Sequence, residues 1–142
     1  MTTLAANVQR FYQIGNNEDY PIIADDIIYE GAAVGENASG YARPLVAADP
    51  FLGFAYANCD NTGGSAGDLN VTVKTRGKVV IPVVGASAIT ANDRPAVYAS
   101  DDNTFTLTST SNSLIGYVSR WISGTNCVVE FDALAVKAAL QA

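Results

Sequence analysis

The sequence predicts an all-β protein, a compact barrel or sandwich of short antiparallel strands with an N-terminal arm and a short C-terminal helix. Short runs of β-branched and aromatic residues alternate with polar residues, and Gly, Asp and Asn turns separate them. Hydrophobic residues make up 49% of the 142 residues and charged residues only 15%, so a substantial core is available. We expect an arm over residues 1–22, one β-domain over residues 23–132 and a helix over residues 133–142.

The clearest strand signals lie in residues 70–84 and in the last third of the chain. Val71 and Val73 alternate with polar residues, Arg76-Gly77 predicts a turn, and Val79 begins a returning strand. Further hairpins are expected around residues 101–103 and 123–125. The predicted core consists of Ile27, Tyr29, Phe54, Val71, Val73, Val79, Ile81, Val97, Phe105, Leu107, Ile115, Val129 and Phe131.

A weak internal repeat suggests two related halves. Phe51-Leu52-Gly53-Phe54 resembles Leu114-Ile115-Gly116-Tyr117 when Gly53 and Gly116 are aligned, and a Val-rich strand follows each. Near the end of the chain, Asp132 is a good N-cap for a short helix with one apolar stripe. About ten residues do not hold a helix alone in water, so this helix must dock.

The first 22 residues are too apolar for a free tail. Phe11, Tyr12, Ile14 and Tyr20 follow no pattern that buries them in a β-domain, and Gly15 with Asn16 interrupts the segment. We predict that this arm lies along a neighbouring protein surface, where it adds main-chain hydrogen bonds to an exposed edge. The alternative interpretation is an edge strand of its own domain.

The charge pattern favours protein partners. A net charge of −6 is the wrong sign for nucleic acid or an anionic membrane surface. Lys74, Arg76 and Lys78 concentrate bases on one predicted hairpin tip, whereas six acids and no base lie between Arg10 and Arg43. Such asymmetry steers a basic tip toward an acidic patch on a neighbour. The simpler alternative is that these charges protect a hairpin edge from aggregation.

The residues that catalysis would need are scarce, so we expect no enzyme, no cofactor and no metal. The chain has no histidine and no Gly-x-Ser-x-Gly motif, and its carboxylate pairs lie in turns. Asp60, Asn61 and Asp68 lack the spacing of a calcium loop, which favours an ordinary surface loop. Cys59 and Cys127 match no metal or redox spacing and are expected as free thiols. The N-terminus does not resemble a secretory signal.

Several short motifs follow one another in an order that resembles a known family: Ile28-Tyr29-Glu30-Gly31-Ala32-Ala33-Val34, Gly40-Tyr41 with Pro44-Leu45, Phe51-Leu52-Gly53-Phe54-Ala55, Asp60-Asn61-Thr62-Gly63-Gly64, Val71-Thr72-Val73, Val97-Tyr98 with Asp101-Asp102-Asn103-Thr104, and Leu114-Ile115-Gly116. Over residues 24–131 this order resembles the head decoration, or structural cement, proteins of tailed bacteriophages. The resemblance implies a β-rich homo-oligomer, with a trimer favoured. It also implies a protein made in the bacterial host cytoplasm that binds the outer surface of the virion and bridges major capsid protein subunits.

Two other classes stay open. A receptor- or carbohydrate-binding module would present exposed aromatic platforms, but the position of Trp121 in a strand favours core or subunit interface. A tail or baseplate component of a virion is the other alternative. The candidate partner-binding residues are Phe11, Tyr12, Ile14, Tyr20, Lys74, Arg76, Lys78 and Trp121.

Overall fold

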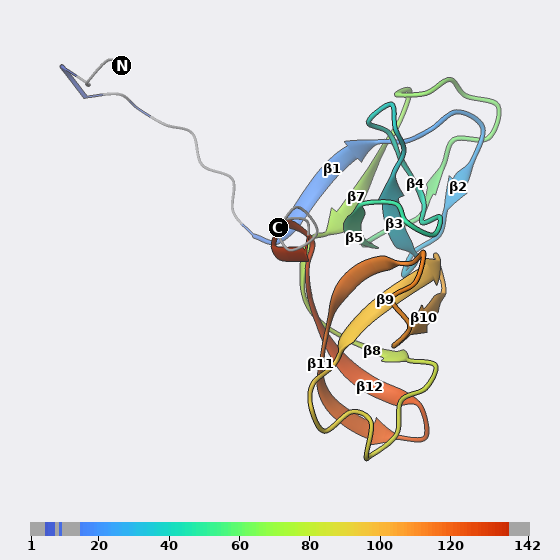
Figure 1. Cartoon of the computed structure of the whole chain (residues 1–142). Coiled ribbons are helices and arrows are strands. Elements are labelled where there is room, and N and C mark those ends of the chain that lie inside the picture. The colour runs from blue at the N-terminus through green and yellow to red at the C-terminus, as the bar shows by residue number, and fades with distance from the viewer. Residues whose placement is uncertain (1–4, 8, 10–14, 137–142) are drawn as a thin grey trace.

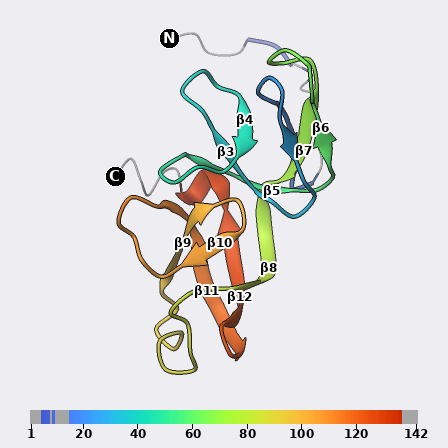
Figure 2. The same ribbon diagram turned by 90° about the vertical axis from the view of Figure 1, so that its right-hand side faces the viewer.

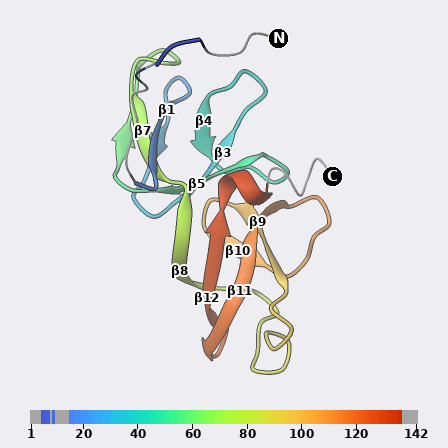
Figure 3. The same cartoon turned by 90° about the vertical axis from the view of Figure 1, so that its left-hand side faces the viewer.

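The computed structural model describes residues 5–7, 9 and 15–136, and its architecture is all-β, as predicted (Figure 1). Its strands form two five-stranded antiparallel sheets and one two-stranded sheet. No sheet closes into a barrel in this part of the chain, so the sandwich-like alternative holds. The first sheet occupies one lobe and the second sheet the other, and the views in Figures 1 and 3 agree on this division.

The N-terminal half supplies most of the first lobe. The first sheet has the order β1-β7-β5-β3-β4. Its strands are β1 (Asn17–Pro21), β3 (Ala33–Glu36), β4 (Ala42–Pro44), β5 (Phe51–Ala55) and β7 (Asn70–Lys74). A two-stranded sheet beside it pairs β2 (Ile27–Ile28) with β6 (Cys59–Asp60). Every pairing is antiparallel, including that of β1 with β7, which are far apart in the sequence.

The second sheet forms the other lobe in the order β10-β9-β11-β12-β8. Its strands are β8 (Arg76–Pro82), β9 (Ala96–Asp101), β10 (Thr104–Thr106), β11 (Ser113–Ser123) and β12 (Asn126–Asp132). The hairpins expected around residues 101–103 and 123–125 are present as β9–β10 and β11–β12. Just beyond β8, the Val84 amide donates to the Phe105 carbonyl at 2.8 Å and draws the two edges of the sheet together at one end.

The predicted hairpin with a basic tip at Lys74, Arg76 and Lys78 is wrong. Only Thr75 separates β7 from β8, and these strands belong to different sheets, so the chain crosses between the lobes here (Figure 2). The Thr75 amide donates to the Asn16 carbonyl at 2.7 Å rather than to a hairpin partner. Val73 packs in one core and Ile81 in the other, and this separation is the physical reason that the two strands part.

The arm boundary predicted at residue 22 also needs correction. Asn17–Pro21 is β1, which pairs along its whole length with β7, so the domain begins at Asn17 rather than at residue 23. Tyr20 faces Val71 in this pairing and packs against the first lobe's core. The alternative interpretation, an integral edge strand, is therefore correct for this stretch. Phe11, Tyr12 and Ile14 lie outside the described residues.

The core divides into two clusters. One fills the second lobe and extends to Phe51 and Phe54 of β5, whereas the other lies within the first lobe around Val34, Val71 and Val73. Most predicted core residues are buried: Phe54, Val71, Val73, Ile81, Val97, Phe105, Ile115, Val129 and Phe131. Ile27, Val79 and Leu107 are only partly buried.

Tyr29, predicted in the core, is 60% exposed. Ile28 is fully buried in its place, and neighbouring strand residues point to opposite faces. The predicted alternation is therefore one residue out of phase here, a shift that moves every side chain to the other face.

The C-terminal helix is present as one turn over residues 133–136, and residues 137–142 lie outside the described part. Asp132 Oδ1 accepts hydrogen bonds from the Leu134 and Ala135 amides at 3.1 and 3.2 Å, which confirms the predicted N-cap. Ala133 and Val136 are buried between the lobes, and the Ala133 amide donates to the Thr75 carbonyl at 2.9 Å. The turn therefore docks on its own domain (Figure 3).

The glycines aligned in the internal repeat have the same physical role. A Cβ on Gly53 would overlap the Lys74 carbonyl oxygen on β7, and a Cβ on Gly116 would overlap the Glu130 carbonyl oxygen on β12. Each glycine thus lets its strand approach a neighbouring backbone more closely than any other residue permits. Both halves therefore use a glycine at the same place in the repeat to allow close approach of a neighbouring strand.

Replacing Phe131 by Ala should lower the free energy of unfolding by roughly 3–5 kcal/mol, because a fully packed ring leaves a cavity. Phe131 is 2% exposed and its ring centroid lies 4.9 Å from that of Phe54. Urea denaturation measures the change, and Tyr117→Ala on the exposed face of β11 is the matched control. Equal midpoints for wild type and Phe131→Ala would refute the packing described here.

Candidate functional site

The basic residues singled out in the sequence are distributed along the crossing between the lobes. Lys74 is half-buried at the end of β7. Arg76 Nε donates to Asn16 Oδ1 at 2.8 Å, and Lys78 Nζ lies 3.9 Å from Glu130 Oε1. Two of the three are thus engaged with their own chain, and they do not form a common tip.

Trp121 lies near the end of β11, opposite Cys127, and is 36% exposed. Its indole N–H donates to the Gly124 carbonyl at 2.9 Å, within the same hairpin. The side chain is fixed against the turn while part of the ring remains open to solvent. Trp121 is therefore not a core residue, and of the two places predicted for it only an interface remains available.

One face of the second sheet carries exposed apolar side chains. Directly paired residues of antiparallel strands project on the same face. The register gives the row Lys78, Glu130 and Tyr117, and beside it the row Val80, Val128 and Arg120. We call these six residues the outer face. Their neighbours Val79, Val129 and Val118 point the other way, into the core.

The outer face interleaves apolar and charged side chains, with Glu130 and Val128 on the middle strand β12. Val80 is 61% exposed and Tyr117 is 48% exposed, whereas Val128 between them is half-buried. A hollow of about 350 Å³ opens beside Tyr117 and Glu130. The site predicted from the sequence includes only Lys78 from this face. The signal for Val80 was available, because Val80 alternates out of phase with Val79 and Ile81.

A second candidate surface is a hollow of about 370 Å³ where β1, β3, β5 and the C-terminal turn meet. Its lining is Gly15, Asn17, Glu18, Tyr20, Glu36, Phe51, Leu52, Thr75, Ala133 and Leu134. We call it the acidic hollow, because its charged side chains are Glu18 and Glu36. Burial, and then the charges of Glu18 and Glu36, raise the pKa of the Tyr20 hydroxyl. Of the predicted partner-binding residues that the structure describes, only Tyr20 lines this hollow.

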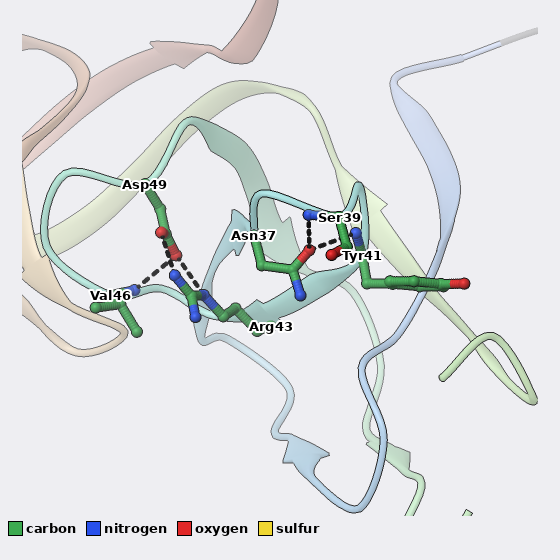
Figure 4. Close-up of polar contacts among 6 residues, drawn as sticks. All are labelled: Asn37, Ser39, Tyr41, Arg43, Val46 and Asp49. Carbon is green, nitrogen blue, oxygen red and sulfur yellow. Dashed lines mark hydrogen bonds and ion pairs between the residues drawn. The ribbon is translucent and has the colours of Figure 1, made fainter. Parts of the chain in front are cut away.

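The base nearest to Glu36 in the sheet is already occupied. Arg43 on β4 donates to both carboxylate oxygens of Asp49, at 2.7 and 2.9 Å (Figure 4). Asp49 is 7% exposed and also accepts from the Val46 amide, and the hydrogen bond to Asp49 raises the pKa of Arg43. Gly35 leaves room for this carboxylate, since a Cβ there would crowd Asp49. A bidentate pair of this kind holds the arginine in place.

The loop over residues 60–68 is held by its own side chains. Asn61 is 4% exposed and its amide donates to the Ile23 and Ser65 carbonyls at 2.9 and 3.1 Å. Asp60 accepts hydrogen bonds from the Thr62 side chain and backbone, which lower the pKa of Asp60. Asp68 Oδ2 accepts from the Ser65 amide at 2.9 Å. Within the residues that the structure describes, no three His, Cys, Asp or Glu side chains are grouped as a metal site.

No helix in the described part of the chain has the length and apolar character to span a bilayer.

Both cysteines are buried free thiols, Cys59 in the first lobe's core and Cys127 in the second lobe's core. Burial raises the pKa of each thiol, and the charge of Asp60 adds to this at Cys59. The thiolate is the reactive form, so both groups are protected by protonation and by lack of access. The prediction of free thiols is confirmed for the fold described here.

Neither thiol should react with an aromatic disulfide reagent at pH 8 while the protein is folded, and both should react after denaturation. Because the pKa of each thiol is raised, the folded state holds these protons more tightly than the unfolded state does. The free energy of unfolding should therefore fall as pH rises past about 8.5, the ordinary cysteine pKa. Cys59→Ala and Cys127→Ala variants assign the two groups, and rapid reaction of the folded protein would contradict this arrangement.

Comparison with protein-family models, with curated proteins and with solved structures found no match.

Proposed function

We propose that this chain is a structural capsid decoration protein that binds the outer surface of a phage head and bridges major capsid protein subunits. The ordered series of motifs over residues 24–131, which resembles that family, supports the proposal. The observation that carries it furthest is the outer face, where exposed apolar side chains lie directly beside charged ones on one sheet. Exposed apolar side chains grouped with polar ones are typical of protein-binding sites.

The chemistry of the outer face suits attachment to a protein lattice. Val80, Val128 and Tyr117 offer apolar contact, whereas Lys78, Arg120 and Glu130 can set the register through complementary charges. The strands hold the backbone of these residues in place, which limits the backbone entropy lost on binding. Many weakly bound copies on a symmetric shell reach high avidity without a tight single contact.

Self-association belongs to the same proposal, with a homotrimer favoured by the family resemblance. The net charge of −6 makes nucleic acid and anionic membranes unsuitable partners, and a location on the virion's outer surface agrees with this. No catalytic role is proposed. Receptor or carbohydrate binding is the second candidate, because Tyr117 presents an exposed aromatic side chain on an ordered strand.

Val80→Asp should weaken binding to undecorated phage heads by at least about tenfold, since it places a charge on the most exposed apolar side chain of the outer face. Ile89→Asp is the matched control, because Ile89 is 82% exposed but lies on the loop after β8. Co-sedimentation with heads measures binding, and circular dichroism checks that both variants fold. Equal binding by Val80→Asp and wild type would remove the outer face from the attachment site. Binding of the wild type to a glycan array, lost in Val80→Asp, would favour the second candidate instead.

Removal of residues 1–14 should leave a folded domain that binds heads less well, because the apolar segment with Phe11, Tyr12 and Ile14 is then absent. The cut must stop before β1, since removal of residues 1–20 would also remove most of a strand that pairs with β7. Circular dichroism should therefore show intact sheet after the first cut and lost sheet after the second. Head binding that is unchanged after the first cut would show that these residues play no part in attachment.

A further inference from the structure

The acidic hollow has the chemistry of a site for a cationic side chain with apolar neighbours. Glu18, Glu36 and Tyr20 line it, together with the apolar residues Phe51, Leu52 and Leu134. Leu134 is 78% exposed, so this part of the lining is open to an incoming group. An arginine beside aromatic residues would satisfy both halves of this surface, because its guanidinium pairs with carboxylates and its stem packs on apolar groups.

The acids of the hollow lack a basic partner among the described residues. The ion pairs among the described residues are Arg43 with Asp49 and Lys78 with Glu130, and none of these four residues lines the hollow. Arg43, on the strand next to Glu36, is held by both oxygens of Asp49 and is therefore unavailable. A positively charged group from outside the described domain could therefore pair with the acids of the hollow.

The chain itself contains a segment of complementary character. Arg10 is the only base before Arg43, and it is followed directly by Phe11 and Tyr12. This segment joins the domain at Gly15, which is itself part of the hollow's lining. Residues 8–14 thus combine one positive charge with apolar side chains, as the hollow requires.

The sequence between Arg10 and Gly15 argues against return to the same copy. Phe11-Tyr12-Gln13-Ile14 contains no Gly, Pro, Asn, Asp or Ser, the residues that form turns. Aromatic and β-branched residues favour extended backbone instead. An extended stretch of five residues would span roughly 17 Å, enough to reach the hollow of a second copy.

We propose that residues 8–14 of one copy dock in the acidic hollow of a second copy, where Arg10 pairs with the carboxylates of Glu18 and Glu36. Phe11 and Tyr12 then contact the apolar wall formed by Leu52 and Leu134. The contact is between copies of this chain, and it rests on the proposed function only for self-association. Removal of residues 1–14 would then weaken head binding through the lost avidity of associated copies.

The test uses full-length chains with reversed charges. Variant one is Arg10→Glu, and variant two combines Glu18→Arg with Glu36→Arg. Analytical ultracentrifugation at tens of micromolar measures self-association, and circular dichroism confirms that each variant folds. Each variant alone should associate at least about tenfold more weakly than wild type, because like charges then meet in the hollow. Arg94→Glu and Asp93→Arg, on an exposed loop, are the matched controls and should associate like wild type.

An equimolar mixture of the two variants is the decisive sample. In a mixed pair, the arm of variant one, now acidic, would meet the basic hollow of variant two, and the unchanged arm of variant two would meet the unchanged hollow of variant one. Exchange between copies should therefore restore the contacts between unlike variants, so the mixture should associate clearly more strongly than either variant alone. In a cyclic trimer at least one of the three contacts still joins like variants, so recovery there is partial. A mixture that stays as weakly associated as its components would overturn the proposal, as would wild-type association by Arg10→Glu alone. Head binding is measured separately with the Val80→Asp variant, so failure here is distinguishable from failure of the proposed function.

Discussion

Four phenylalanine rings join the two five-stranded sheets, and the arrangement of every other element depends on this contact. Phe51 and Phe54 come from β5 of the first sheet, whereas Phe105 and Phe131 come from the second sheet. Ring centroids lie 4.9–6.2 Å apart, mostly edge to face, a geometry that adds stabilisation beyond apolar burial. Because β5 contributes to both cores, the two lobes form one structure rather than two independent domains joined by a linker.

The crossing at Thr75 completes this junction. The backbone of Thr75 bonds to Asn16 on one side and to Ala133 on the other, so the start of β1, the crossing and the C-terminal turn are tied together. The acidic hollow lies at this tie, with Thr75, Ala133 and Gly15 in its lining. Its shape therefore depends on contacts between segments that are far apart in the sequence.

The outer face lies on the second lobe and the acidic hollow at the junction of the lobes, and the two offer different chemistry. The outer face mixes apolar side chains with both signs of charge, which suits a broad protein contact. The hollow is concave and negative, which suits one inserted cationic group. A decoration protein needs two kinds of contact, one to the shell beneath it and one to its neighbours, and these surfaces are chemically suited to that division.

The sequence by itself determined the strand class, the later hairpins, the Asp132 cap and most of the buried residues, because alternation and turn residues are local signals. It also contained the aligned glycines Gly53 and Gly116, although their reason, close approach of a neighbouring backbone, appears only in the folded chain. Only the tertiary structure decided that β7 and β8 part at Thr75 and that Asn17–Pro21 is a strand of the first sheet. The tertiary structure also placed Val80 and Tyr117 on the same face of the second sheet, and it placed Glu18 and Glu36 in the same hollow. Each of these features depends on which strands pair. The residues of one strand specify which of its faces is apolar, but not which neighbouring strand pairs with it.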